Sequence, residues 1–187
     1  GMARLYLVRH AQAAARFDED PDPGLSEEGK EAAVDLALQL ESLGPMQILT
    51  SPLERARESA LPLANRWGIM PEVSAAFSEI PTPPEIAEKG IRARGPWLQQ
   101  IATQRFSAQP PLIRAWREGL VGMLRSSRYD AVIFTHFMVI NAALGAALND
   151  DRLVIMNPDY CSCTILEVDR SGLSLITRGK EAKTPVL

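Results

Sequence analysis

Residues 4–10 read RLYLVRH, an aliphatic run that ends in an arginine and a histidine. The run is too short and too uniformly apolar for a surface helix, so it predicts a buried strand of a parallel sheet. A second such run, AVIFTH at residues 131–136, also ends in a histidine, and the chain has 2 histidines in all. Because ligands bind beyond the carboxyl ends of parallel strands, we expect His10 and His136 to face one crevice.

The first third of the chain alternates between strand and helix patterns. Ser26 is placed to cap a helix over 27–43, and a short strand pattern follows at 46–50. Ser51 is then expected to cap the next helix, with Pro52 at its first position. This alternation predicts an α/β fold in which helices cover a mostly parallel sheet.

Prolines mark the middle of the chain. Residues 70–111 hold seven prolines and few periodic apolar positions, which predicts a long loop or insertion with at most a short helix near 85–105. Helices are predicted at 112–124, from an apolar stripe, and at about 139–148. The tail at 162–177 predicts a β-hairpin at one side of the sheet.

The composition is that of an ordinary soluble protein, with 46% hydrophobic and 23% charged residues. We expect residues 2–187 to form one domain that carries the insertion. The net charge of −3 argues against a nucleic-acid or membrane-surface partner, so local positive charge would have to capture an anionic ligand. No apolar stretch approaches the ~20 residues of a spanning helix, and the start lacks a signal-peptide pattern, which predicts a cytoplasmic protein.

Two cysteines, Cys161 and Cys163, are spaced i, i+2. On a strand this spacing puts both thiols on one face, as is typical of small buried side chains. A metal-binding pair is the alternative, but no third or fourth ligand lies nearby in the sequence. We therefore expect these cysteines to pack in the interior.

The pair Arg9-His10 suits an anionic phosphorus group. A histidine at a strand end is more often a structural hydrogen-bonding residue than a nucleophile. The adjacent guanidinium favours the nucleophile, because it can bind a phosphate through two parallel hydrogen bonds. Positive neighbours would also lower the pKa of the imidazole and keep it neutral, the form that attacks phosphorus. Two arginines at one crevice would repel a cation, which disfavours a metal site.

Four segments occur in a characteristic order: LVRHAQ at 7–12, SPLERA at 51–56, FSE at 77–79 and FTH at 134–136. In order and spacing they resemble the histidine phosphatase superfamily, also called the phosphoglycerate mutase-like family. The resemblance implies a three-layer α/β/α fold. It also implies phosphoryl transfer through a phosphohistidine, without a metal or another cofactor.

The resemblance assigns a role to each charged residue of these segments. His10 would take the phosphoryl group, and Glu79 would protonate the leaving group and later activate water. The residues that bind the phosphoryl group would be Arg9, Arg55 and His136. Arg55 directly precedes an alanine, as the family's second arginine does, so Arg57 is expected on the surface.

Three points stay open in this assignment. The family's usual WEG-like continuation after the acid is missing here, so Glu85 or Glu88 could serve in place of Glu79. Gln12 and Thr135 are candidate contacts to the phosphate or the substrate. Glycine commonly follows each histidine in the family, whereas this chain has larger residues that narrow the space near a phosphate, Ala11 and Phe137.

The charged residues alone do not separate a phosphatase from a mutase, which returns the phosphoryl group to its product. Only 57 positions separate Glu79 from His136, which leaves little chain to shield the phosphoenzyme from water and favours hydrolysis. The expected function is therefore hydrolysis of phosphorylated small molecules, with phosphoprotein substrates and homo-oligomers left open. The alternatives are a mutase and a catalytically impaired relative that only binds phosphorylated ligands.

Overall fold

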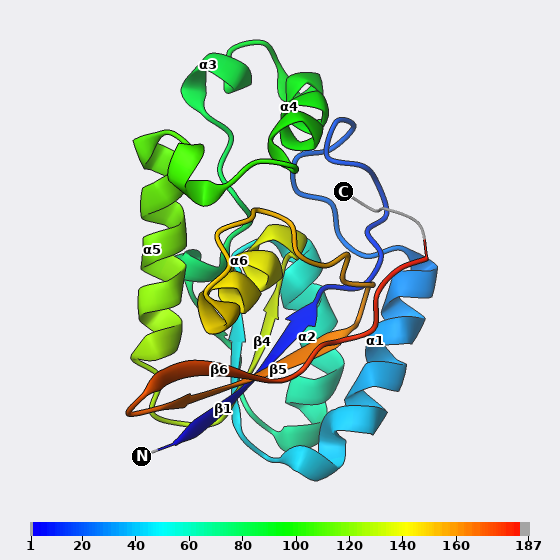
Figure 1. Cartoon of the computed structure of the whole chain (residues 1–187). Helices are drawn as coiled ribbons and strands as arrows, with labels where there is room; N and C mark the ends of the chain where they lie inside the picture. Colours follow the sequence, from blue (N-terminus) through cyan, green and yellow to red (C-terminus); the bar gives the residue numbers. More distant parts are fainter. Residues whose placement is uncertain (1, 184–187) are drawn as a thin grey trace.

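The computed structural model describes residues 2–183 and contains a six-stranded sheet (Figure 1). Its strand order is β3-β2-β4-β1-β5-β6. The strands are β1 (Ala3–Arg9), β2 (Gln47–Thr50), β3 (Glu72–Val73), β4 (Ala131–Thr135), β5 (Cys163–Asp169) and β6 (Gly172–Thr177). The first four run parallel, and β5 and β6 form an antiparallel hairpin. The predicted mostly parallel sheet and C-terminal hairpin are both confirmed.

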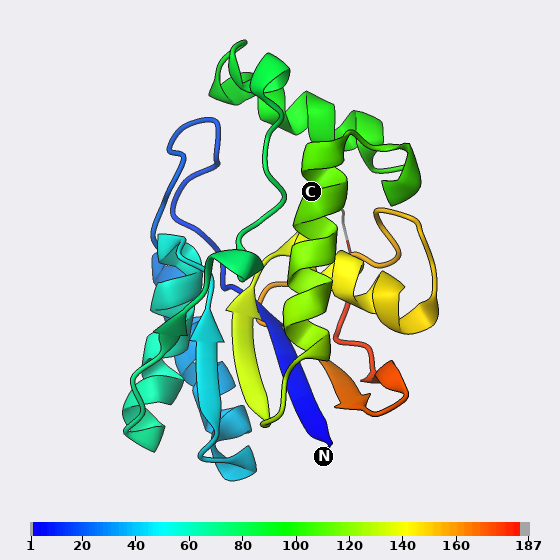
Figure 2. The ribbon, with the colours of Figure 1, turned by 90° about the vertical axis from the view of Figure 1, so that its left-hand side faces the viewer.

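Helices cover both faces of this sheet, as the two views show (Figures 1 and 2). They are α1 (Glu27–Leu40), α2 (Glu54–Trp67), α3 (Pro84–Ala87), α4 (Arg94–Ile101), α5 (Pro111–Arg125) and α6 (Phe137–Leu148). Helices α1 and α2 pack on one face, and α5 and α6 pack on the other. The three-layer α/β/α architecture is confirmed. Within residues 2–183, no helix combines the length and the hydropathy needed to cross a membrane.

Alternating side chains of the central strands form two separate cores. Leu5, Leu7 and Ile133 are buried toward α5 and α6, whereas Val8 and Phe134 are buried toward α1 and α2. Burial on both faces explains why β1 and β4 are almost continuously apolar. These strands are therefore rigid supports for the residues that follow them.

The register of β1 and β4 brings the two histidines together. Arg9 lies opposite Thr135, so His10 and His136 are the next residues on neighbouring parallel strands. The backbone N–H of His10 donates to the carbonyl of Thr135 at 3.0 Å, which continues the ladder by one residue. The expectation that both rings lie at one edge of the sheet is confirmed.

Two predicted helix starts were wrong. Helix α2 begins at Glu54 with Leu53 as its N-cap, so Ser51 and Pro52 lie outside it. The Ser51 hydroxyl accepts from Leu53 N at 3.0 Å, a local turn that competes with helix capping. Helix α6 begins at Phe137, directly after His136, and not at about residue 139 as predicted. Its first residues are buried like those that follow.

The insertion at 70–111 contains more regular structure than predicted. It holds β3, α3 and α4, together with 3₁₀ turns at Ala75–Phe77, Ile91–Ala93 and Phe106–Ala108. These elements are too short to show a clear apolar period in sequence, yet α4 buries Trp97 and Ile101. In Figure 1, α3 and α4 lie above the carboxyl ends of the strands, beside the loop that follows β1.

The cysteines differ in part from the expectation. Cys161 lies in a turn with a φ of 59°, outside β5, so the two thiols do not share a strand face. Both pack against the core beneath α1 and α2 as small apolar side chains. Burial raises the pKa of Cys161 to about 11 and that of Cys163 to about 12. Among residues 2–183, no three His, Cys, Asp or Glu side chains gather as metal ligands would.

Candidate active site

The two imidazole rings lie against each other at the sheet edge. Their centroids are 5.2 Å apart with an interplanar angle of 62°. His10 is 6% exposed and His136 is fully buried. The two buried rings are in edge contact. Which of their nitrogens carry protons decides which can donate and which can accept.

His10 has a defined tautomer. Its Nδ1 lies 2.7 Å from the carbonyl oxygen of Ala11, so this nitrogen carries the proton and donates it. Its Nε2 accepts from Nε of Arg55 at 3.1 Å, which requires a lone pair. Burial holds the pKa of His10 well below its ordinary value, and the charges of Arg55 and Arg9 lower it further. Nε2 is therefore a nucleophilic lone pair at neutral pH.

His136 is held by a residue that was predicted for another role. Its Nε2 lies 2.7 Å from the hydroxyl of Ser51, which already accepts from Leu53 N. With one lone pair and one proton left, the hydroxyl can accept from Nε2 or donate to it, and donation to Nε2 places the ring proton of His136 on Nδ1. Nδ1 is buried with no hydrogen-bond partner among the described residues, and burial lowers the pKa of this ring. In the tautomer in which Ser51 donates, His136 offers an N–H donor beside His10.

Arg9 is fixed between two aromatic rings. Its guanidinium carbon lies 4.3 Å from the ring centre of Tyr160 and 5.4 Å from that of Phe137, and its Nη1 donates to Pro158 O at 3.0 Å. Sequence analysis missed Tyr160, which lies in a loop without a regular pattern. Phe137, expected to narrow the site, lies against the arginine.

Arg55 is the second residue of α2, where the helix start directs it toward the histidines. Besides the bond to His10, its Nη1 is buried and has no partner among the described residues. Arg57 lies on the surface as expected, with Glu54 at 3.8 Å. Of the two arginines considered, the fold brings Arg55 to the histidines.

Glu79 lies at the start of α6. Both carboxylate oxygens accept from Met138 N at 3.0 Å, and one also accepts from Ile80 N at 3.0 Å. Met138 is the second residue of α6, so the carboxylate lies at the positive end of that helix, beside His136. Glu85 and Glu88 are exposed on the insertion. Of the three candidates for the acid, Glu79 is the one whose carboxylate the fold holds against the residues that follow His136.

Thr135 supports the position of Glu79. Its buried hydroxyl donates to the carbonyl of Phe77 at 2.7 Å, and Trp116 Nε1 donates to Ser78 O at 3.0 Å. The two carbonyls before Glu79 are therefore both anchored. The hydroxyl of Thr135 is committed to this bond, which leaves phosphate binding through it without support from the geometry.

Gln12 connects the loop after β1 to α1. Its side-chain oxygen accepts from the Ser26 hydroxyl at 2.9 Å, and Ser26 caps α1 by accepting from Gly29 N at 3.0 Å. The cap predicted at Ser26 is confirmed. Gln12 is exposed, and both its backbone and its side-chain oxygen accept from Ser26 at the base of this loop.

Sequence analysis also missed Arg94, the first residue of α4. Its Nη1 donates to Thr82 Oγ1 at 2.7 Å, and its guanidinium carbon lies 5.2 Å from the ring centre of Phe17. Burial lowers its pKa, while the charge of Glu79 raises it. The sequence signal was a pair of arginines, Arg92 and Arg94, within the proline-rich insertion.

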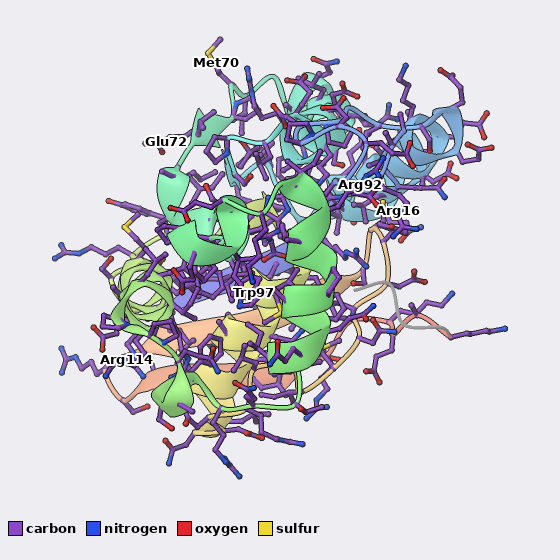
Figure 3. The ribbon with its side chains drawn as sticks, turned by 90° about the horizontal axis from the view of Figure 1, so that it is seen from above. Arg16, Met70, Glu72, Arg92, Trp97 and Arg114 are labelled. Carbon is purple, nitrogen blue, oxygen red and sulfur yellow. The ribbon has the colours of Figure 1, made fainter. Side chains whose placement is uncertain are left out.

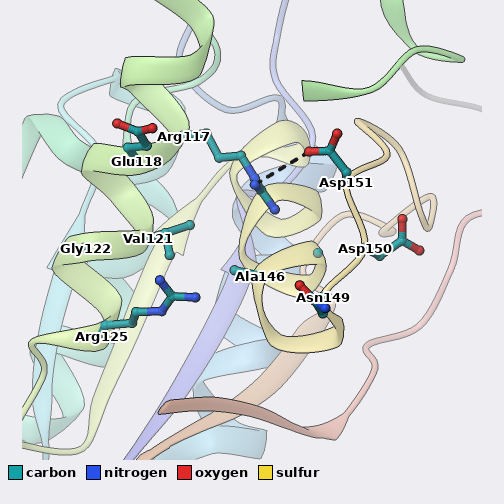
Figure 4. Close-up of a pocket in the computed structure, with 10 residues that line it drawn as sticks. Arg117, Glu118, Val121, Gly122, Arg125, Ala146, Asn149, Asp150 and Asp151 are labelled. Carbon is teal, nitrogen blue, oxygen red and sulfur yellow. Dashed lines mark ion pairs between the residues drawn. The ribbon is translucent and has the colours of Figure 1, made fainter. Parts of the chain in front are cut away.

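A separate hollow lies between α5 and α6 and contains none of the predicted site residues (Figure 4). Arg117 lines it and pairs with Asp151 at 3.9 Å. Its charged lining consists of two guanidiniums and three carboxylates, so neither charge dominates: Arg117, Arg125, Glu118, Asp150 and Asp151. The chemistry predicted from the sequence lies at the histidines, not here.

Comparisons with known proteins give the family and the fold of the chain. The sequence model of the histidine phosphatase superfamily (branch 1) matches residues 5–180. The chain is 31% identical over 162 residues to 5''-phosphoribostamycin phosphatase of Niallia circulans, covering 75% of this chain and 76% of that protein. A mycobacterial glucosyl-3-phosphoglycerate phosphatase has a similar structure, with a TM-score of 0.70, 21% identity and coverage of 97% and 100%. Bacillus stearothermophilus YhfR has a TM-score of 0.74, 22% identity and coverage of 96% and 98%.

Proposed function

The chain belongs to branch 1 of the histidine phosphatase superfamily, and we propose that it hydrolyses phosphomonoesters through a phosphohistidine on His10. One observation carries the assignment of the nucleophile. The Nε2 lone pair of His10 is directed at Arg55, and Nδ1 is fixed by the Ala11 carbonyl. A phosphoryl group bound by Arg55 would therefore meet a lone pair on a ring that cannot rotate away.

The first step transfers the phosphoryl group. Arg9, Arg55 and the Nδ1–H of His136 bind its oxygens, and Nε2 of His10 attacks phosphorus. The bond between phosphorus and the leaving oxygen breaks, and Glu79 supplies the proton that converts this oxygen into an alcohol. The Ala11 carbonyl stabilises the N–H of the phosphorylated ring.

The second step is hydrolysis. Glu79, now ionised, takes a proton from water, and the water oxygen attacks phosphorus. The Nε2–phosphorus bond breaks, which restores neutral His10 and releases inorganic phosphate. The proton taken from water replaces the one that left with the alcohol, so His10 and Glu79 are both restored at the end of the cycle.

The substrates we propose are phosphorylated small molecules. The two relatives named as phosphatases are named for 5''-phosphoribostamycin and glucosyl-3-phosphoglycerate, which supports hydrolysis over a mutase reaction. We propose that the reaction needs no metal, because Arg9, Arg55 and Arg94 surround the site and would repel a cation. Full activity after EDTA treatment supports this, and restoration of lost activity by a divalent ion contradicts it.

Rapid-quench trapping tests the covalent step. The protein is mixed with a ³²P-labelled phosphomonoester and quenched in base, where phosphohistidine survives, and then exposed to acid, where it is lost. We expect label on the wild-type protein and none on His10→Asn. Absence of both label and phosphate release over a broad panel would indicate a relative that only binds phosphorylated ligands.

A further inference from the structure

Three desolvated guanidiniums lie around the histidines without a carboxylate partner. Burial lowers the pKa of Arg9, Arg55 and Arg94, and within residues 2–183 none of them forms an ion pair. Arg117, whose pKa burial also lowers, is paired with Asp151. A desolvated charge without a partner is costly and marks a place where a ligand supplies the counter-charge.

Two of these three arginines are already assigned. Arg9 and Arg55 flank His10, one next to it in the chain and the other bonded to its Nε2. These two arginines are the ones proposed to bind the oxygens of the phosphoryl group. Arg94 comes from the insertion, outside the four family-like segments, and the proposed reaction leaves it without a role.

Arg94 contacts two segments that adjoin the proposed catalytic residues in the chain. It donates to Thr82, which lies three residues after Glu79, and it stacks on Phe17 in the loop that follows His10. Guanidinium has five N–H donors, and Thr82 accepts the one hydrogen bond that the described residues show for Arg94. Several N–H donors of Arg94 therefore remain to bind a ligand that lies between these two segments.

Arg94 lies near enough to Glu79 and His136 for these groups to interact electrostatically. Its charge lowers the pKa of His136, and the charge of Glu79 acts on Arg94 in turn. The pKa of His10 is lowered by burial, Arg55 and Arg9. Because Glu79 is the group that would protonate the leaving oxygen, a neighbour of Glu79 faces what is attached to that oxygen.

We propose that Arg94 determines specificity by binding a second anionic group, a carboxylate or a second phosphate, on the leaving-group part of the substrate. The inference rests on the proposed function, since it takes Glu79 as the acid. With Glu79 protonated, three guanidiniums face a phosphoryl group with two negative charges, which leaves one positive charge for a second anion. A charge-assisted hydrogen bond at this position should change kcat/KM by roughly 10- to 100-fold.

A matched pair of substrates tests the proposal. 3-Phosphoglycerate and glycerol 3-phosphate differ in having a carboxylate or a hydroxymethyl group at the far end. We expect wild type to prefer 3-phosphoglycerate, and Arg94→Ala to lower kcat/KM for it by about 10- to 100-fold. For glycerol 3-phosphate, the same substitution should change kcat/KM by less than about threefold, since neutral contacts are weaker.

The control is Arg114→Ala, which removes the same charge from an exposed site on α5, away from Arg16 and Arg92 (Figure 3). It should leave the ratio of the two substrates unchanged. An equal loss for both substrates in Arg94→Ala, or a wild-type preference for glycerol 3-phosphate, would overturn the proposal.

Binding to His10→Ala, measured by titration calorimetry, gives a readout independent of turnover. Tighter binding of 3-phosphoglycerate that is lost on adding Arg94→Ala would support the subsite even if wild type hydrolysed neither compound. Absence of hydrolysis of both compounds by wild type would count against the proposed function and not against the subsite. Equal binding of the two compounds to His10→Ala would overturn the subsite.

Discussion

The Nε–H of Arg55 donates to Nε2 of His10 across 3.1 Å, so the proposed phosphate-binding arginine and the proposed nucleophile are direct partners. The bond keeps the lone pair aimed at the place where the guanidinium would hold a phosphoryl group. It also keeps the positively charged guanidinium beside Nε2, which disfavours protonation of the ring. Substrate binding must exchange this bond for contacts with phosphate oxygens.

Arg55→Lys should therefore be poorly tolerated. Lysine keeps the charge, but it lacks the planar fork that reaches both a phosphate and Nε2. We expect kcat/KM for an aryl phosphate to fall by about 100-fold, the loss of one or two charge-assisted hydrogen bonds. Arg57→Lys, two residues along the same helix and exposed, should change kcat/KM by less than about twofold. Equal effects of the two substitutions would remove Arg55 from the site.

Glu79→Gln should separate substrates by their leaving groups. An amide cannot donate the proton that an alkoxide needs, whereas a nitrophenolate leaves without one. We expect turnover of alkyl phosphates to fall by about 10³-fold and that of p-nitrophenyl phosphate by about tenfold or less in the first, bond-breaking step. Pre-steady-state bursts isolate that step.

Glu85→Gln and Glu88→Gln are the controls for Glu79, since both carboxylates are exposed on the insertion. Neither should change the ratio of alkyl to aryl turnover. If Glu79→Gln slowed both substrate classes by the same factor, its carboxylate would be a structural cap of α6 and not the acid.

Acid should destabilise the protein through its two histidines. Both have a pKa well below 6.5 in the folded state, chiefly because of burial. Below pH 6.5 the unfolded chain binds protons that the folded chain does not, so the free energy of unfolding falls as the pH is lowered through this range. Each histidine contributes a slope of at most about 1.4 kcal/mol per pH unit.

Urea unfolding of wild type, His10→Asn and His136→Asn at pH 7.5, 6.5 and 5.5 measures these slopes. Each substitution should remove its histidine's share of the pH dependence. The carboxylates contribute equally in all three proteins, so they cancel in the comparison. Parallel stability curves for the three proteins would show that each ring binds protons equally in the folded and unfolded chains, so that folding does not lower its pKa.

The sequence was sufficient for the parts of the site that follow buried strands. Strands β1 and β4 are apolar on both faces because helices cover both, and that pattern is visible without a structure. His10 and His136 follow those strands, so strand direction alone places them at one edge. The assignment of Arg55 to the site depended on the SPLERA motif, because a single arginine on a helix is usually at the surface.

Other residues of the site could not be read from local patterns. Ser51 precedes a proline and a helix, which is the pattern of a cap, but a bond from its N–H to Phe134 O turns it toward His136. Tyr160 and Arg94 come from irregular segments that only long-range packing brings to the sheet edge. Their roles depend on neighbours distant in the chain, which periodicity does not encode.

Gly29, in the first turn of α1, should not tolerate replacement by a residue with a Cβ. A Cβ there would overlap the carbonyl oxygen of Gln12, which is backbone and cannot move aside alone. We expect Gly29→Ala to lower the free energy of unfolding by about 1–3 kcal/mol, as overpacking does. It should also lower kcat, because the displaced loop includes Ala11, whose carbonyl orients His10.

Gly119→Ala is the matched control, because it adds the same methyl group within α5 where no atom outside the local helix backbone lies within 4 Å. It should raise the free energy of unfolding by about 0.5–1 kcal/mol, the helix preference of alanine over glycine, and leave kcat unchanged. Urea unfolding and steady-state kinetics on both variants decide the point. If Gly29→Ala were as stable and as active as Gly119→Ala, the loop after β1 would not depend on close packing against α1, and the orientation of His10 would need another explanation.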